Sequence, residues 1–135
     1  MPRVDRQTLK NKDKIIGDIS RFTRKQNILS ENEELKPYET DGLAAYRQTP
    51  MLVVLPETTQ EVSRILSYCN KNKIKVVPRG AGTGLAGSAL PLADCILLGL
   101  GKFNKILDID YKNRCVVAQP GVTNLSITHA VQNEG

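Results

Sequence analysis

The residues with the clearest chemical potential form a glycine-rich stretch directly after an apolar run. Residues 78–88 read Pro-Arg-Gly-Ala-Gly-Thr-Gly-Leu-Ala-Gly-Ser, and the apolar run is 74–77. Glycine tolerates positive φ and has no Cβ, so successive backbone N–H groups of such a loop can point inward and bind an anion, typically a phosphate. Arg79 adds a permanent positive charge suited to phosphate oxygens. The stretch therefore predicts a phosphate-binding loop.

Two common phosphate-binding motifs do not account for this loop. Residues 82–87 match the G-x-G-x-x-G pattern of a dinucleotide-binding unit, but that unit requires a long helix after the turn. Here Pro91 follows four residues after Gly87, and the apolar run 95–98 comes at once, which leaves no room for the helix. A Walker loop is excluded because Ser88, and not lysine, follows Gly87. A glycine-rich surface turn without a ligand stays open as the alternative.

The composition is that of an ordinary globular protein. The chain has 135 residues, 40% of them hydrophobic and 24% charged, which is enough for one modest domain. The net charge of +5 comes from basic residues spread along the chain, and aromatic residues make up only 4%, so no nucleic-acid partner is expected. No stretch approaches the ~18 apolar residues that cross a bilayer, and the N-terminus lacks the apolar core of a secretory signal. We therefore expect a cytoplasmic protein without a transmembrane segment.

The other reactive side chains suggest no second site. The three cysteines fit neither a disulfide framework nor a metal site, and each lies in an apolar pattern that predicts burial. The only histidine, His129, is interpreted as a surface residue of the last helix and not as a catalytic base. Asp41 and Asp110 are interpreted as turn residues, while Asp108 has no assigned role. The cysteines are Cys69, Cys95 and Cys115.

The elements before the loop predict an α/β layout. We expect a helix outside the core over about 6–22, a short helix capped by Ser30 and ended by Pro37, and a strand over 52–55. A capping box at 58–61 begins an amphipathic helix that leads to a strand over 74–77. Strand, helix and strand of these lengths form a right-handed unit with parallel strands. The loop should then lie beyond the carboxyl end of a parallel strand, where open α/β sheets bind ligands.

The elements after the loop predict a third strand and a hairpin. Residues 95–100 should join the same sheet, and 106–109 and 115–119 should flank a turn over 110–114. Pro120 and Gly121 end this hairpin, and Thr123 or Asn124 can cap a closing helix. The strand at 115–119 would be left as an unpaired edge. We therefore expect marginal stability or self-association through that edge.

Four segments resemble one family of flavoproteins. Residues 75–91 closely resemble the pyrophosphate loop of FAD-linked oxidases with a p-cresol methylhydroxylase-type flavin domain. The nearest likeness is to the large flavoprotein subunit of glycolate oxidase and the related D-2-hydroxy-acid (D-lactate) dehydrogenases. Residues 37–46, 51–56 and 119–122 resemble the lead-in, the first strand and the second flavin-contacting turn of that domain, so the resemblance covers about 27–135.

The resemblance implies an α+β fold with two subdomains and the flavin between them. This chain would supply the α/β first subdomain, with its small parallel sheet, and the start of the second. Residues 1–36 would be an N-terminal helical extension, and 37–135 a truncated FAD-binding domain with the substrate domain absent.

The resemblance also implies where FAD would bind. The backbone of 79–84 would hold the pyrophosphate, the hydroxyl groups of Thr83 and Ser88 could add hydrogen bonds, and 119–121 would lie against the flavin ring or ribityl chain. Some relatives attach FAD covalently through a histidine at the position of Thr83, so FAD here should be non-covalent. The implied cofactor-binding residues are Pro78, Arg79, Gly80, Ala81, Gly82, Thr83, Gly84, Leu85, Gly87, Ser88, Gln119, Pro120 and Gly121.

Two functional hypotheses follow. In the first, the chain is the N-terminal portion of an FAD-dependent 2-hydroxy-acid dehydrogenase, with glycolate or D-lactate as the type of substrate. Its implied partners are a second flavin-domain subunit and an iron–sulfur subunit, which would place it at the periphery of the inner membrane. In the second, the chain is a free-standing nucleotide-binding or interaction module with no redox activity. Under either hypothesis the chain holds no catalytic residue and no metal site, and we expect little or no turnover from it alone.

Overall fold

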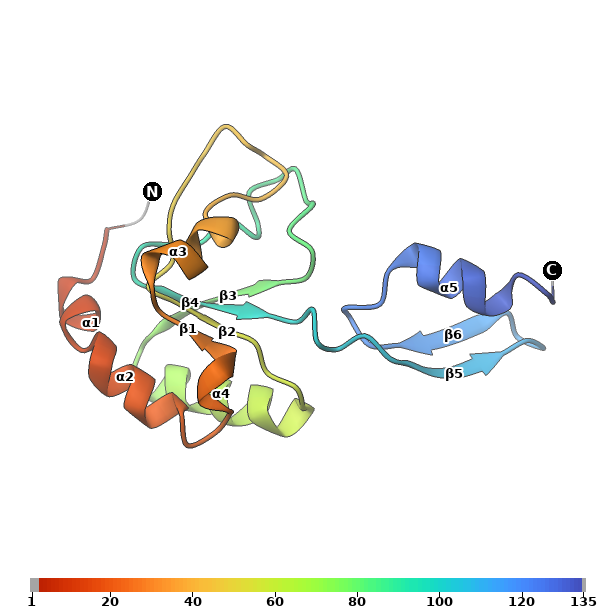
Figure 1. The fold of residues 1–135 in the computed structure, drawn as a ribbon, viewed down its shortest axis with the longest axis horizontal. Coiled ribbons are helices and arrows are strands. Elements are labelled where there is room, and N and C mark those ends of the chain that lie inside the picture. Colours follow the sequence, from red (N-terminus) through yellow and green to blue (C-terminus); the bar gives the residue numbers. More distant parts are fainter. Residues whose placement is uncertain (1–2, 135) are drawn as a thin grey trace.

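The computed structural model describes residues 3–134, which form a four-stranded sheet with its helices and, to one side, a hairpin with one helix (Figure 1). The sheet has the order β1-β2-β4-β3, and the hairpin pairs β5 with β6. Residues 1, 2 and 135, at the outer ends of the two predicted domains, lie outside the described residues. The strands are β1 (Ile28–Leu29), β2 (Leu52–Val54), β3 (Lys75–Arg79), β4 (Cys95–Gly99), β5 (Ile106–Asp110) and β6 (Cys115–Ala118).

Strand β4 is the centre of the first sheet. It runs parallel to both of its neighbours, with Leu97 paired to Val53 on one side and to Val77 on the other. All five of its residues are buried, as expected for an apolar strand covered on both faces. The predicted parallel arrangement of β2 and β3 is confirmed, and β4 lies between them. The short antiparallel strand β1, at the edge next to β2, was not predicted.

Helices cover both faces of this sheet. On one face, α2 (Lys12–Ile19) and α4 (Thr59–Lys71) bury Ile15, Ile19 and Ile65 against the strands. On the other face, Leu35 from α3 (Asn32–Leu35) packs with Val53 and Leu97. Full burial of one such side chain contributes about 1.5–3 kcal/mol. The expectation that the N-terminal helix lies outside the core is therefore wrong, because its isoleucines recur on the face that meets the sheet.

The N-terminal helices also differ in their ends from the sequence-based prediction. The chain forms α1 (Arg6–Lys10), capped by the Asp5 carboxylate, and then α2, in place of one helix over 6–22. Glu31, and not Ser30, caps α3, because its carboxylate accepts the N–H of Glu34. The α3 helix ends at Leu35, two residues before Pro37, as predicted, and the proline lies in a separate 3-10 turn, where its missing N–H needs no partner. Two 3-10 turns, η1 (Lys25–Asn27) and η2 (Lys36–Tyr38), complete this region.

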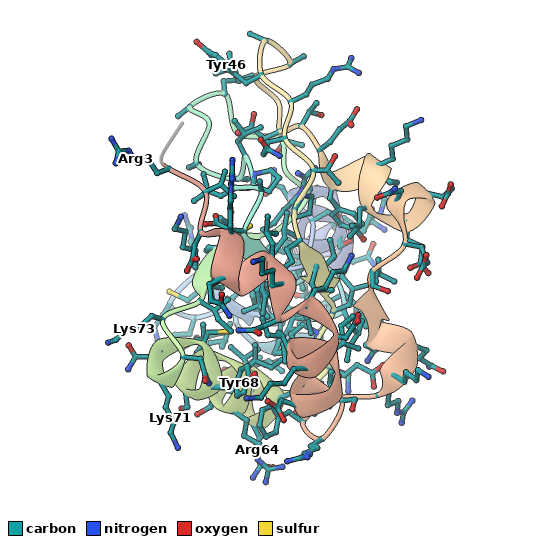
Figure 2. All side chains as sticks on the ribbon, turned by 90° about the vertical axis from the view of Figure 1, so that its left-hand side faces the viewer. Arg3, Tyr46, Arg64, Tyr68, Lys71 and Lys73 are labelled. Atoms are coloured by element: carbon teal, nitrogen blue, oxygen red, sulfur yellow. The ribbon has the colours of Figure 1, made fainter. Side chains whose placement is uncertain are left out.

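Helix α4 begins as predicted. The Thr58 hydroxyl accepts the N–H of Glu61 at 3.2 Å, and the Glu61 carboxylate accepts the N–H of Glu57 at 2.9 Å, one residue before the position that a capping box requires. Near its other end, Tyr68 donates to the Asp18 carboxylate of α2 at 2.9 Å (Figure 2). Burial, followed by this hydrogen bond to a carboxylate, raises the pKa of Tyr68 to about 12.

An ion pair between a buried carboxylate and a partly exposed lysine ties the beginnings of three elements together. The Lys75 ammonium, at the start of β3, lies 2.7 Å from the carboxylate of Asp94, which precedes β4 and is 2% exposed. The same carboxylate oxygen accepts the backbone N–H of Asp5, at the cap of α1, at 2.6 Å. Burial is the largest single influence on Asp94 and opposes its charge, but the hydrogen bonds from Lys75 and from the N–H of Asp5, together with the charge of Lys75, outweigh it and hold the pKa below its usual value.

The hairpin and α5 (Asn124–Val131) form a separate unit to one side of the first sheet (Figure 1). Their bounds agree with the predicted hairpin, and the Thr123 hydroxyl caps α5 by accepting the N–H of Ser126 at 3.1 Å. Cys69 and Cys95 are buried, but Cys115 is exposed because it lies at the end of a strand that has one neighbour within residues 3–134. Among the helices of this part of the chain, none is both long enough and apolar enough to cross a bilayer.

Replacing Lys75 with methionine should destabilise the fold in a pH-dependent way. The variant keeps the apolar stem but leaves the buried Asp94 carboxylate without its cation, so the free energy of unfolding at neutral pH should fall by about 1–3 kcal/mol, allowing for the partial exposure of Lys75. Because the folded pKa of Asp94 is depressed, the contribution is complete above the unfolded pKa of about 3.9 and is lost as the pH falls through the folded pKa.

Urea unfolding between about pH 7 and pH 3 measures this difference, with Lys71→Met as the control at an exposed lysine. A difference between Lys75→Met and the native chain that did not shrink at acid pH would contradict the ion-pair explanation.

Replacing Val117 with lysine should reduce self-association. Val117 and Leu107 are 54% and 60% exposed on the two strands of the hairpin, and β6 has an open edge within the described residues. A lysine on an edge strand opposes pairing with a second chain. Sedimentation velocity over a concentration series should show less dimer for Val117→Lys and no change for Val4→Lys, which alters a distant exposed valine. Equal association of both variants would show that the hairpin is not the contact.

Candidate functional site

The predicted phosphate-binding loop lies beyond the carboxyl end of β3. Residues 80–94 join β3 to its parallel neighbour β4 without a helix, a connection that usually contains one. Pro78 and Arg79, which the sequence placed in the loop, belong to β3. Proline is tolerated there because β3 is an edge strand and a missing N–H leaves no partner unsatisfied. We call residues 80–88 the glycine loop.

The glycine loop carries a run of unused backbone donors. The N–H of Leu100 donates to the carbonyl of Arg79, and the N–H of Leu90 donates to the carbonyl of Gly87. The stretch between the Arg79 carbonyl and the Leu90 N–H contains the ten N–H groups of residues 80–89. None of these ten donates a hydrogen bond to another group within residues 3–134. Gly82 and Gly87 have φ of +72° and +73°, which favour glycine. An exposed chain of unpaired N–H groups with left-handed turns is suited to bind an anion.

The Arg79 side chain is hydrogen-bonded to the segment around Tyr38. Its guanidinium donates to the backbone carbonyls of Tyr38, at 3.3 Å, and Thr40, and it lies over the Tyr38 ring with 5.7 Å to the centroid. A Cβ on Gly82 would collide with this guanidinium. Arg79 therefore links the segment around Tyr38 to the glycine loop, a role that its charge alone did not predict.

Gly42 contacts the loop from the same segment. A Cβ at this position would lie 2.5 Å from the carbonyl oxygen of Thr83 and 2.8 Å from that of Gly84, closer than any real side chain allows. The neighbouring Asp41 is 6% exposed, and its Oδ1 accepts the N–H of Leu43 at 3.0 Å, which confirms the predicted turn. Its Oδ2 is buried without a hydrogen-bond partner within residues 3–134. Sequence reasoning identified the turn but not the contact that Gly42 makes.

The second predicted segment, 119–121, lies next to the loop. A Cβ on Gly80 would be 4.0 Å from the carbonyl oxygen of Pro120. The Gln119 side-chain oxygen accepts the N–H of Lys105 at 3.0 Å, so this side chain closes the hairpin. The N–H of Gly121 donates to the carbonyl oxygen of Phe103 at 2.7 Å. A Cβ on Gly121 would lie 2.7 Å from that same oxygen. Glycine is therefore required where this turn meets the end of β4.

The other titratable residues do not gather at the loop. His129 is exposed on α5, as expected. Asp110 accepts two hydrogen bonds from Asn113, of which the side-chain bond contributes most to lowering the pKa of this carboxyl group, and this confirms its role in the turn. Within residues 3–134, no three His, Cys, Asp or Glu side chains are placed to hold a metal ion. An open groove of about 640 Å³ lies between α5 and the hairpin, away from the loop; it is lined in part by Ile109, Val116, Ile127 and Val131.

Comparison with known sequences connects this geometry to flavoproteins. The sequence matches the model of the FAD binding domain family over residues 50–135. It is 52% identical over 104 residues to glycolate oxidase subunit GlcD of Escherichia coli strain K12, which covers 77% of this chain and 21% of that protein. It is 36% identical over 107 residues to the mitochondrial D-2-hydroxyglutarate dehydrogenase of Arabidopsis thaliana, with 77% and 19% covered. The chain spans about a fifth of the length of these relatives.

Comparison with solved structures gives the same fold. The crystal structure of p-cresol methylhydroxylase with substrate bound superposes with a TM-score of 0.81 at 26% identity, covering 97% of this chain and 26% of that one. The 4-ethylphenol oxidase of Gulosibacter chungangensis, in complex with isoeugenol, gives 0.82 at 25% identity, with 98% and 26% covered. These matches confirm the predicted fold class.

Two alanine substitutions should separate backbone strain in the loop from its contact with Arg79. Gly82→Ala and Gly87→Ala both place a Cβ at positive φ, which destabilises by about 1 kcal/mol, but only the first displaces the Arg79 guanidinium. Gly82→Ala should therefore lower the free energy of unfolding by about 1 kcal/mol more than Gly87→Ala does, through lost hydrogen bonds.

Chemical denaturation measures both variants, alone and combined with Arg79→Ala. With Arg79 truncated, the two substitutions should become equally destabilising, because the colliding group is gone. A difference that persisted in the absence of Arg79 would have to come from another contact.

Proposed function

The chain belongs to the FAD binding domain family, and from that premise we propose that it is the FAD-binding portion of a flavin-dependent 2-hydroxy-acid dehydrogenase or oxidase. The observation that carries the proposal is the run of unpaired N–H groups in the glycine loop. The sequence relatives, which include a glycolate oxidase subunit and a D-2-hydroxyglutarate dehydrogenase, support a 2-hydroxy acid of the glycolate or D-lactate type as substrate of the whole protein.

The loop fits the pyrophosphate of FAD. A pyrophosphate presents several anionic oxygens to close neighbours, and the loop offers successive N–H groups on a backbone without large side chains between Gly80 and Gly84. We propose that the backbone of 79–84 binds these oxygens and that the Thr83 and Ser88 hydroxyls add hydrogen bonds. Leu85, 75% exposed at the outer edge of the loop, would pack on the bound nucleotide.

The 119–121 turn would then face the flavin. Because Gly80 lies beside Pro120, a ligand held by the loop would come close to the turn. The Gln119 side chain is engaged with Lys105, so we assign the contact with the ribityl chain or ring to the backbone of this turn. Residues 37–135 would supply these FAD contacts, while the helices before residue 37 support the sheet that positions them.

FAD should be held without a covalent bond. Thr83 occupies the middle of the loop, and residues 79–94 contain no histidine, cysteine or tyrosine that could form a stable bond to a flavin. The one histidine of the chain lies on α5, and the buried thiol of Cys95 has its pKa raised to about 11 by burial, which keeps it protonated and unreactive.

When bound, the flavin would accept a hydride from the α-carbon of the 2-hydroxy acid. The residues of this chain would bind and orient the cofactor. Substrate binding would come from the remainder of the longer protein. Because a relative is named as a subunit, we further propose that the whole protein works in an assembly, with a second flavin-domain subunit and an iron–sulfur subunit as partners.

A fluorescence titration with FAD tests the proposal. The purified chain should bind FAD saturably, and Gly80→Val should weaken binding by about tenfold or more, since its side chain would stand between the loop and the 119–121 turn. Gly101→Ala is the control, because a Cβ there meets nothing within 4 Å. A chain shown by near-ultraviolet circular dichroism to be folded, yet unable to bind FAD, would overturn the proposal.

A further inference from the structure

Two carbonyl groups of the glycine loop pack against a neighbouring segment of the chain. A Cβ added at Gly42 would lie 2.5 Å from the Thr83 oxygen and 2.8 Å from the Gly84 oxygen. Two consecutive peptide groups of the loop therefore lie against the backbone of Gly42, with no room for a side chain between them.

The N–H groups that follow these two carbonyls are free. Neither the N–H of Gly84 nor that of Leu85 has a hydrogen-bond partner within the described chain, so both are available to a ligand. The contact at Gly42 and the two free donors therefore belong to the same two peptide groups.

The segment that contains Gly42 is itself held in place. Arg79, at the end of β3, donates to the carbonyls of Tyr38 and Thr40 and stacks on the Tyr38 ring. Residues 39–48 form a loop that is closed by the N–H of Gln48, which donates to the carbonyl of Glu39 at 2.8 Å. The same 39–48 loop carries Tyr46 outward at its tip (Figure 2). The Tyr38–Gly42 segment is thus clasped to the strand from which the loop departs.

We propose that Gly42 and Arg79 are positioning residues that hold the glycine loop in its binding conformation. Gly42 admits the two carbonyl oxygens that a Cβ would repel, and the loop can then keep the conformation in which the N–H groups of Gly84 and Leu85 are free for the pyrophosphate. Arg79 holds the Tyr38–Gly42 segment in place and acts through this clasp, not as a direct phosphate ligand. The inference rests on the proposed binding of FAD by the loop.

The test combines FAD affinity with amide NMR of the purified chain. In the native chain, FAD should produce its largest amide shifts in the loop at Gly84 and Leu85. Gly42→Ala should weaken FAD binding by about tenfold or more and abolish those two shifts. The control Gly17→Ala adds a methyl group that meets nothing within 4 Å, so it should leave affinity and shifts unchanged.

A second variant keeps the test decisive if Gly42→Ala fails to fold. Arg79→Lys retains the positive charge but loses the planar fork and the stacking on Tyr38. If Arg79 acts as a clasp, this variant should bind FAD about fivefold or more weakly and lose the Gly84 and Leu85 shifts. Native affinity in Arg79→Lys would show that charge suffices and would overturn the clasp.

The outcomes separate this inference from the proposed function. A native chain that binds FAD while Gly42→Ala folds and binds equally well, or while the amides of Gly84 and Leu85 stay unshifted, would overturn the positioning role and leave FAD binding intact. A folded native chain that binds no FAD would overturn the proposed function and this inference with it.

Discussion

Ten successive backbone N–H groups without an internal partner are the constraint on which the site depends. Such groups cannot be buried, because an unpaired buried donor is strongly unfavourable, so the glycine loop must remain at the surface and face water or a ligand. The loop follows the carboxyl end of β3, while the Lys75–Asp94 pair holds together the amino-terminal ends of β3 and β4. The ion pair and the unpaired N–H groups therefore lie at opposite ends of β3.

The elements with strong periodicity could be predicted from the sequence, and contacts between distant segments could not. The spacing of Val62, Ile65 and Cys69 predicted α4, and the apolar run at 95–98 predicted the buried strand β4. The glycine-rich pattern correctly located a loop beyond a parallel strand, because it reflects local backbone freedom. The direction of the Arg79 side chain and the contact of Gly42 depend on a segment about forty residues away, on which local propensity carries no information. The exposure of Cys115 depends in the same way on which neighbours a strand has.

The family assignment and the physical description support each other at different scales. Sequence and structural likeness establish an FAD binding domain, but they say nothing about how the backbone of this loop is held. The structure supplies that part: a glycine without room for a side chain, an arginine directed at backbone carbonyls, and a second turn beside the first. Leu107 and Val117 stay exposed on the hairpin, whose two strands have no further neighbours within residues 3–134.

The position of β4 has a consequence for how the chain folds during synthesis. Strands β2 and β3 are separated by β4 and form no ladder with each other, so neither can complete its pairing when it leaves the ribosome. The first sheet can close only after Gly99 has emerged, and the glycine loop acquires its anchored ends in that same step. Until β4 has been synthesised, the apolar strands β2 and β3 and the amphipathic helix α4 lack the strand on which they pack. Misassembly or chaperone binding would therefore occur before β4 emerges.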